Sequence, residues 1–128
     1  MGYEWLHFNV ETDKEGIVVA TLTEKKVLTL GTIQSITHEL EVLLGFANKS
    51  KKLVVNFAEV EFMTTTMIGA LMRFDEQATN RNIRYAFCAL QLQMMQVLTI
   101  SQLRRHFPIR RDVTSACRFV KTEDESCR

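Results

Sequence analysis

The residues LVVNF (53–57) form a short, nearly all-apolar run between two stretches that have helical periodicity. The stretch before this run places six apolar residues on one helical stripe: Ile33, Ile36, Leu40, Leu43, Leu44 and Ala47. The stretch after it does the same with Met67, Ala70, Leu71, Phe74 and Ala78. A strand that is apolar on both faces is typical of a sheet covered by helices on both sides. The pattern therefore predicts an α/β domain in which helices connect the strands.

The N-terminal part of the chain has the alternation of a β-hairpin. Leu6, Phe8 and Val10 alternate with polar residues, and the residues TDKEG (12–16) that follow are typical of a turn. The β-branched run IVVATLT (17–23) then predicts a second strand, antiparallel to the first.

The C-terminal part predicts two further strands and two further helices. We expect a strand at 83–90, then a helix that packs through Leu92, Met95, Leu98 and Ile100. A short strand at 106–109 and a last helix capped by Asp112 follow. The predicted fold is thus a mixed β-sheet with an N-terminal hairpin and about four packed α-helices.

Composition and charge limit the classes of protein to which the chain can belong. Its 128 residues are 46% hydrophobic and carry 16 basic and 15 acidic side chains. A disordered chain would be less apolar, and a net charge of +1 gives no field that would attract nucleic acid or a membrane surface. The sequence shows no signal peptide and no apolar stretch long enough to span a bilayer. We therefore expect one cytoplasmic domain over residues 1–120 with a polar tail over 121–128.

No pattern in the sequence indicates a catalytic, cofactor or metal site. Cys88, Cys117 and Cys127 are too few and too scattered for a disulfide framework or a zinc site. The His-Glu pair at 38–39 does not complete the H-E-x-x-H motif of metalloproteases, because Val42 stands in place of the second His. His7 and His106 belong to no recognisable pair of nucleophile and base. We expect that the protein is not an enzyme and uses no cofactor.

Three consecutive threonines, Thr64, Thr65 and Thr66, lie where the chain enters the second predicted helix. One threonine hydroxyl can cap that helix, which contributes about 1 kcal/mol, and this simple role is our first interpretation. Unpaired N–H groups and the helix dipole also favour negative charge at such a position, so a hydroxyl there is a suitable carrier of phosphate. Phosphorylation would add roughly −1.5 to −2 charges and would repel a partner docked over the loop.

The stretch LVVNFAEVEFMTTTMIGALMRF (53–74) resembles the central segment of STAS domains, the anti-sigma-factor antagonist family. In that family a strand and a loop lead into Asp-Ser-Ser-Gly-Leu and an amphipathic helix, and the order of elements agrees over most of the chain. The first Ser is the residue phosphorylated by a kinase that is also the anti-sigma factor. The resemblance implies that Thr65 matches this Ser and Thr66 the second Ser. Homodimerisation is left open.

The chain departs from the family motif at three positions. Thr64 replaces the Asp and Met67 replaces the Gly, while Asn56 stands where an Asp is usual. We expect the loop from Thr64 to Ile68, with Asn56 and Arg73, to form the docking face for an anti-sigma factor or kinase-like partner. Met67 and Ile68 would add an apolar contact surface.

Several alternatives remain at this point. A domain of this kind could be an accessory subunit of a transport or lipid pathway, a constitutive scaffold that is not phosphorylated, or a small α/β enzyme whose site the sequence does not reveal. The run RRHFPIRR (104–111) holds four Arg, and we interpret it as a solvated loop with surface ion pairs. A contribution of this run to partner docking is the alternative.

Overall fold

A computed structural model describes residues 4–121 and confirms the predicted α/β fold. Five strands form one mixed sheet in the order β1-β2-β4-β6-β7. The elements along the chain are β1 (Phe8–Thr12), β2 (Val18–Leu22), β3 (Lys26–Val27), α1 (Leu30–Phe46), β4 (Lys52–Asn56), β5 (Phe62–Met63), α2 (Thr65–Asn80), β6 (Arg84–Cys88), α3 (Leu92–Ile100), β7 (Ile109–Arg110) and α4 (Val113–Lys121).

The N-terminal hairpin forms as the alternation predicts. β1 pairs with β2 in antiparallel register, with Phe8 opposite Leu22. The carboxylate of Asp13 accepts hydrogen bonds from the N–H groups of Glu15 and Ile17, and Gly16 adopts a φ of 88°, which glycine tolerates best. The remaining neighbours, β2-β4, β4-β6 and β6-β7, are parallel, so their carboxyl ends lie at the same edge of the sheet.

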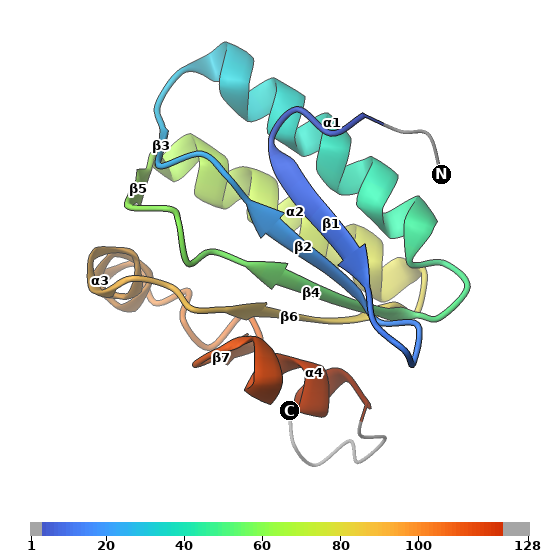
Figure 1. Cartoon of the computed structure of the whole chain (residues 1–128). Coiled ribbons are helices and arrows are strands. Elements are labelled where there is room, and N and C mark those ends of the chain that lie inside the picture. Colours follow the sequence, from blue (N-terminus) through green and yellow to red (C-terminus); the bar gives the residue numbers. More distant parts are fainter. Residues whose placement is uncertain (1–3, 122–128) are drawn as a thin grey trace.

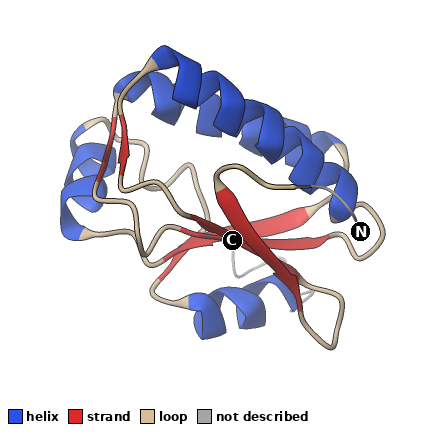
Figure 2. Cartoon of the chain, turned by 45° about the horizontal axis from the view of Figure 1, so that its top comes forward, coloured by secondary structure: helices blue, strands red, loops and turns tan. Residues whose placement is uncertain are grey.

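Helices cover both faces of this sheet, which explains the apolar character of β4. The helices α1 and α2 pack against one face and α4 against the other (Figures 1 and 2). Leu53 and Val55 belong to the larger core under α1 and α2, whereas Val54 belongs to a smaller core under α4. All three side chains are fully buried.

Two features of the fold differ from the sequence prediction. The connection 58–63 contains β5, which pairs with β3 in a separate parallel two-stranded sheet. Strands of two residues leave no periodicity in a sequence, so this pair could not be predicted. In α3 the buried residues are Met94 and Leu98, whereas Leu92 and Ile100 are largely exposed. The prediction is therefore confirmed for Leu98 and wrong for Leu92 and Ile100, because the closely spaced apolar residues of this helix fit more than one phase.

The last helix begins where Asp112 predicts. The N–H group of Ser115 donates a hydrogen bond to the Asp112 carboxylate, and this bond lowers the pKa of that carboxyl. The last strand was predicted at 106–109, whereas the structure has a shorter strand that begins further along the chain, at Ile109–Arg110. The polar tail predicted from residue 121 onward lies, apart from Lys121, outside the described residues.

Candidate functional site

The threonine run lies at the carboxyl end of the parallel strands. It directly follows β5, which pairs with β3, and leads into α2. The N–H group of Thr64 donates to the carbonyl of Val27, at 3.2 Å. The carbonyl of Thr64 accepts the first two hydrogen bonds of the helix, from the N–H groups of Met67 and Ile68. The backbone at this position is therefore tied both to β3 and to α2.

Thr64 is the N-cap residue of α2, but its side chain does not cap the helix. Its φ of −77° and ψ of 166° are usual for this position, yet its hydroxyl makes no cap hydrogen bond. The hydroxyl oxygen is buried and has no hydrogen-bond partner among the described residues. Thr29, by contrast, caps α1 by accepting from the N–H group of Thr32. The expectation that a threonine side chain caps the second helix is therefore wrong.

Thr65 and Thr66 occupy the first turn of α2, and both side chains are exposed. The N–H groups of a first helical turn have no acceptor within the helix, and α2 has no acidic residue in that turn. The helix dipole adds partial positive charge at the same point. Among the residues predicted for the docking face, Thr65 and Thr66 thus combine accessible hydroxyls with an environment that favours an anion.

Met67 and Ile68 do not form a contact surface. Their exposed fractions are 0% and 4%, and both belong to the larger core. They lie on the stripe of α2 that continues through Leu71 and Phe74 toward the sheet. The prediction of an apolar docking loop at these two residues is therefore wrong, since helical periodicity directs both side chains inward.

Arg73 lies on the outer side of α2 and is exposed. It follows Thr66 by seven residues, or two helical turns, which places both residues on one face about 10 Å apart along the axis. The structure is thus consistent with a docking face that extends from Thr66 to Arg73.

The side chain of Asn56 connects the end of β4 to β2 and to the loop that follows β4. Its side-chain amide nitrogen donates to the hydroxyl of Thr21 on β2, and its amide oxygen accepts from the N–H group of Ala58. The thiol of Cys88 on β6 lies 3.9 Å from the same oxygen. Asn56 therefore joins the ends of three strands at the start of the loop, and this positioning role was not predicted.

Cys88 lacks the character of a nucleophile. Its side chain is buried, and burial raises the pKa of the thiol to about 12. The thiol is consequently protonated at neutral pH, whereas nucleophilic cysteines react as thiolates.

Four exposed apolar side chains lie on or beside β5 and the segments next to it, namely β3, the start of α1 and α3, and no pattern in the sequence indicated them. Leu28 and Leu30 flank the cap of α1, Phe62 lies on β5, and Leu92 begins α3. Their exposed fractions range from 42% to 72%. Figure 1 shows that β3, β5 and the starts of α1 and α2 lie together at one end of the molecule. We call these four residues the apolar fringe.

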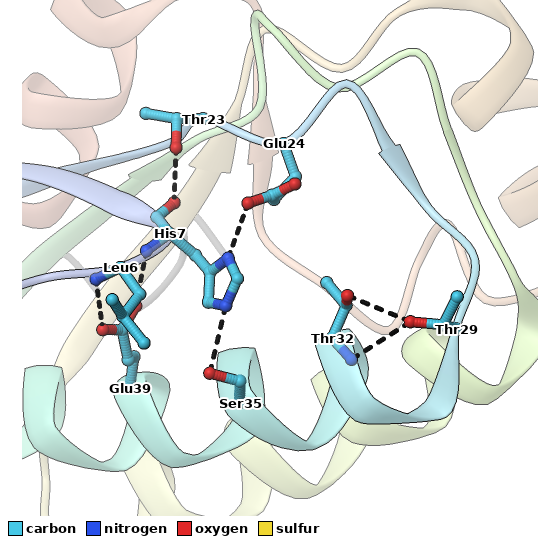
Figure 3. Close-up of polar contacts among 8 residues, drawn as sticks. All are labelled: Leu6, His7, Thr23, Glu24, Thr29, Thr32, Ser35 and Glu39. Carbon is cyan, nitrogen blue, oxygen red and sulfur yellow. Dashed lines mark hydrogen bonds and ion pairs between the residues drawn. The ribbon is translucent and has the colours of Figure 1, made fainter.

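A second group of polar contacts joins the segment before β1 to α1 (Figure 3). The carboxylate of Glu39, only 1% exposed, accepts from the N–H groups of Leu6 and His7 at 2.7 and 2.9 Å. The imidazole of His7 bridges Glu24, at 2.6 Å, and the hydroxyl of Ser35, at 3.0 Å. We call these five residues the N-terminal clasp.

The N-terminal clasp has the order of a serine, a histidine and a carboxylate, as in nucleophilic hydrolases. Catalysis would also need hydrogen-bond donors that stabilise an oxyanion. Here Ser35 lies within the second turn of α1, where backbone N–H groups bond to the preceding turn. We therefore interpret the clasp as the contact that fixes the N-terminal segment to α1.

Within residues 4–121, no helix is long and apolar enough to cross a membrane. The same residues contain no group of three or more His, Cys, Asp or Glu side chains that could hold a metal ion.

Comparisons with known proteins agree with this architecture. The family model of the STAS domain matches residues 8–116. An anti-sigma factor antagonist from Mycobacterium paratuberculosis has a similar structure, with a TM-score of 0.75 at 16% identity, over 90% of this chain and 93% of the other. For an anti-sigma factor antagonist from Thermotoga maritima the TM-score is 0.72 at 15% identity, over 90% and 95% of the two chains.

A third similar structure is the Bacillus cell fate determinant SpoIIAA in its phosphorylated form. It has a TM-score of 0.60 at 15% identity, over 88% of this chain and 98% of the other. A comparison with curated protein sequences finds no match. At these identities the structural likeness shows the fold that the chains share.

Proposed function

The chain belongs to the STAS domain family, and on this premise we propose that it is a protein-binding module of the anti-sigma-factor antagonist kind. Its docking face consists of Thr65, Thr66 and Arg73 on α2 together with the apolar fringe. Its partner is an anti-sigma factor or a kinase-like regulatory protein, and the process is partner switching in transcriptional regulation. By this proposal the domain binds in the cytoplasm and performs no catalysis.

One observation carries this proposal: two exposed hydroxyls stand at a helix start without a side-chain cap, and β5, which leads into this helix, and the segments beside β5 carry exposed apolar side chains. Apolar groups at the centre of a protein interface supply affinity, and polar groups at its edge supply orientation. Clusters of exposed apolar side chains are uncommon on a surface that only faces water. The apolar fringe thus takes the contact role that the sequence analysis gave to Met67 and Ile68.

We further propose that phosphorylation of Thr65 weakens the contact with the partner. A phosphate on Thr65 would meet the free N–H groups and the positive end of α2, so the domain itself would remain folded. A partner seated on the apolar fringe would have to bury this charge, which is costly without a matching cation. The solved phosphorylated form of SpoIIAA supports a modification of this kind in a chain of the same fold.

Two alternatives make different predictions about the same residues. A constitutive scaffold would use the docking face without modification of Thr65. The other alternative is an accessory role in a transport or lipid pathway, which would leave Thr65 without a switch role. SLC26A9 shares the fold, with a TM-score of 0.70 at 11% identity over 85% of this chain and 20% of that one.

A binding experiment with three variants tests the proposal. Thr65→Glu should reduce partner capture from the native cell extract at least tenfold, whereas Thr65→Ala should retain it. Thr114→Glu is the matched control, because Thr114 is an exposed threonine in the first turn of α4, on the other face of the sheet. Undiminished capture by a folded Thr65→Glu variant would remove Thr65 from the mechanism.

Mass spectrometry of the tryptic peptide 53–73 from cells in growth and under stress separates the switch from the scaffold. Phosphate on Thr65 that changes with the condition supports the switch. A peptide that is well detected and always unmodified supports the constitutive scaffold.

A further inference from the structure

A basic groove lies at the amino ends of the parallel strands, opposite the docking face. It encloses about 630 Å³ between the end of α2, the start of β6 and α4. Six of its lining residues are cationic: Lys51, Lys52, Arg84, Arg105, Arg110 and Lys121. Small-molecule sites in proteins commonly measure about 300–1,000 Å³.

Within residues 4–121, acidic groups do not balance the charge of the groove. Asp75 is the one carboxylate among its described lining residues, and it already accepts from the hydroxyl of Tyr85 and lies 3.3 Å from the imidazole of His106. Of the six cations, Lys121 alone has an acidic partner among the described residues, namely Glu15 at 3.2 Å. Within the part of the chain that the structure describes, five cations without an acidic partner are thus gathered in one groove, although the net charge of the protein is only +1.

The contacts of the other cations are with neutral groups. The Lys51 ammonium donates to the side-chain oxygen of Asn48 and to the carbonyl of Arg81. Arg110 donates to the carbonyl of Ile109. Such bonds hold the side chains in place but do not neutralise their charge. A bound anion could therefore accept charge-assisted hydrogen bonds from several of these side chains at once.

Arg84 and Arg110 are held in place by one aromatic ring. Their guanidinium carbons lie 4.6 and 4.1 Å from the centroid of Phe119, and Nε of Arg84 donates to the carbonyl of the same residue. Nη2 of Arg84 is buried and has no hydrogen-bond partner among the described residues. A buried charged donor without a partner is costly, and a bound anion would satisfy it.

We propose that this groove binds a small molecule that carries phosphate groups. Guanidinium groups match phosphate oxygens with two parallel hydrogen bonds, and the lysines at the start of β4 add charge without a fixed geometry. The basic run 104–111 is therefore more than a solvated loop, because the fold joins its Arg105 and Arg110 to cations from β4 and β6.

The chain itself contains a rival occupant. Glu123, Asp124 and Glu125 follow Lys121 closely in the sequence. If these carboxylates fill the groove, neutralising them in the full-length chain should change anion binding. A test must therefore include Glu123→Gln, Asp124→Asn and Glu125→Gln in one variant.

Calorimetric titration of the full-length chain with sodium pyrophosphate in 50 mM NaCl tests the proposal. We expect saturable binding that Arg84→Gln and Arg105→Gln each weaken at least tenfold. Arg118→Gln is the matched control, since Arg118 is exposed on α4 and does not line the groove, and its affinity should stay within twofold. Arg105 is also exposed, so its variant should fold even if Arg84→Gln does not.

Three results would overturn the proposal. The first is absence of saturable binding up to 10 mM pyrophosphate, and the second is an equal loss of affinity in Arg118→Gln, which would mean diffuse attraction. The third is binding that occurs only in the tail variant, which would assign the groove to the acidic tail. With binding established, a tighter affinity for ADP than for pyrophosphate would identify an organic phosphate as the ligand, and equal affinity an inorganic one.

Discussion

Glu39→Gln should destabilise the domain by releasing the N-terminal clasp. The wild-type carboxylate is 1% exposed and accepts two backbone hydrogen bonds, from Leu6 and His7. Glutamine has nearly the same shape, but its one carbonyl oxygen can accept only one of these bonds while its NH₂ group faces the other N–H. A hydrogen bond to a charged group contributes about 1.5–3 kcal/mol, and the lower cost of burying a neutral amide offsets part of the loss. We therefore expect the free energy of unfolding to fall by about 2 kcal/mol.

The expected shift in melting temperature follows from the size of the chain. Unfolding entropy is about 2.1 cal/mol/K per residue, so 128 residues give about 0.27 kcal/mol/K, and 2 kcal/mol corresponds to about 7 °C. Thermal unfolding monitored by circular dichroism measures this shift. Glu41→Gln is the control, because Glu41 is exposed on the same helix, and its melting temperature should change by less than about 2 °C.

A local measurement separates the N-terminal clasp from a general loss of stability. Trp5 is the single tryptophan of the chain, and its ring packs edge-on against Phe8 and Phe46. In Glu39→Gln we expect its native fluorescence to shift toward that of solvent-exposed tryptophan, and the amide of His7 to exchange faster. If Glu39→Gln and Glu41→Gln melt at the same temperature, the two hydrogen bonds contribute nothing net and the reasoning is refuted.

Two further predictions concern buried side chains near the docking face. Met67→Ala should lower the free energy of unfolding by about 2–5 kcal/mol, as is usual for a fully buried Met, while Thr66→Ala should change it by less than about 0.5 kcal/mol. Chemical denaturation measures both values. A Met67→Ala variant of unchanged stability would place this side chain at the surface. Burial raises the pKa of the Cys88 thiol to about 12, so a thiol reagent at pH 8 should modify Cys88 only after unfolding. The unfolded thiol ionises near pH 9.0, whereas the folded one stays protonated up to about pH 12. The free energy of unfolding of the wild type should therefore fall between pH 9.0 and about 12 more steeply than that of Cys88→Ala. Equal slopes of these two free energies against pH would contradict this.

The sequence by itself determined the parts of this protein that depend on periodicity. An apolar run between two amphipathic stripes specifies a central strand with helices on both faces, and β4 has this environment. The alternation before residue 24 specifies the hairpin, and Asp112 specifies the start of α4. These signals are local, because each lies within the sequence of one element or one turn.

The tertiary structure decided which side chains reach the surface at the loops and which of them meet. The sequence placed Met67 both on the apolar stripe of the second helix and in the docking loop, and the packing of α2 against the sheet decides for the stripe. The apolar fringe comes from four segments, and the basic groove joins Lys51, Arg84 and Arg105, which are far apart along the chain. Glu39 is the buried polar side chain of the amphipathic helix α1, and only the folded N-terminal segment supplies the two N–H groups that make its burial possible. Such sites depend on long-range packing, which brings charges and hydroxyls together at distances that no local pattern encodes.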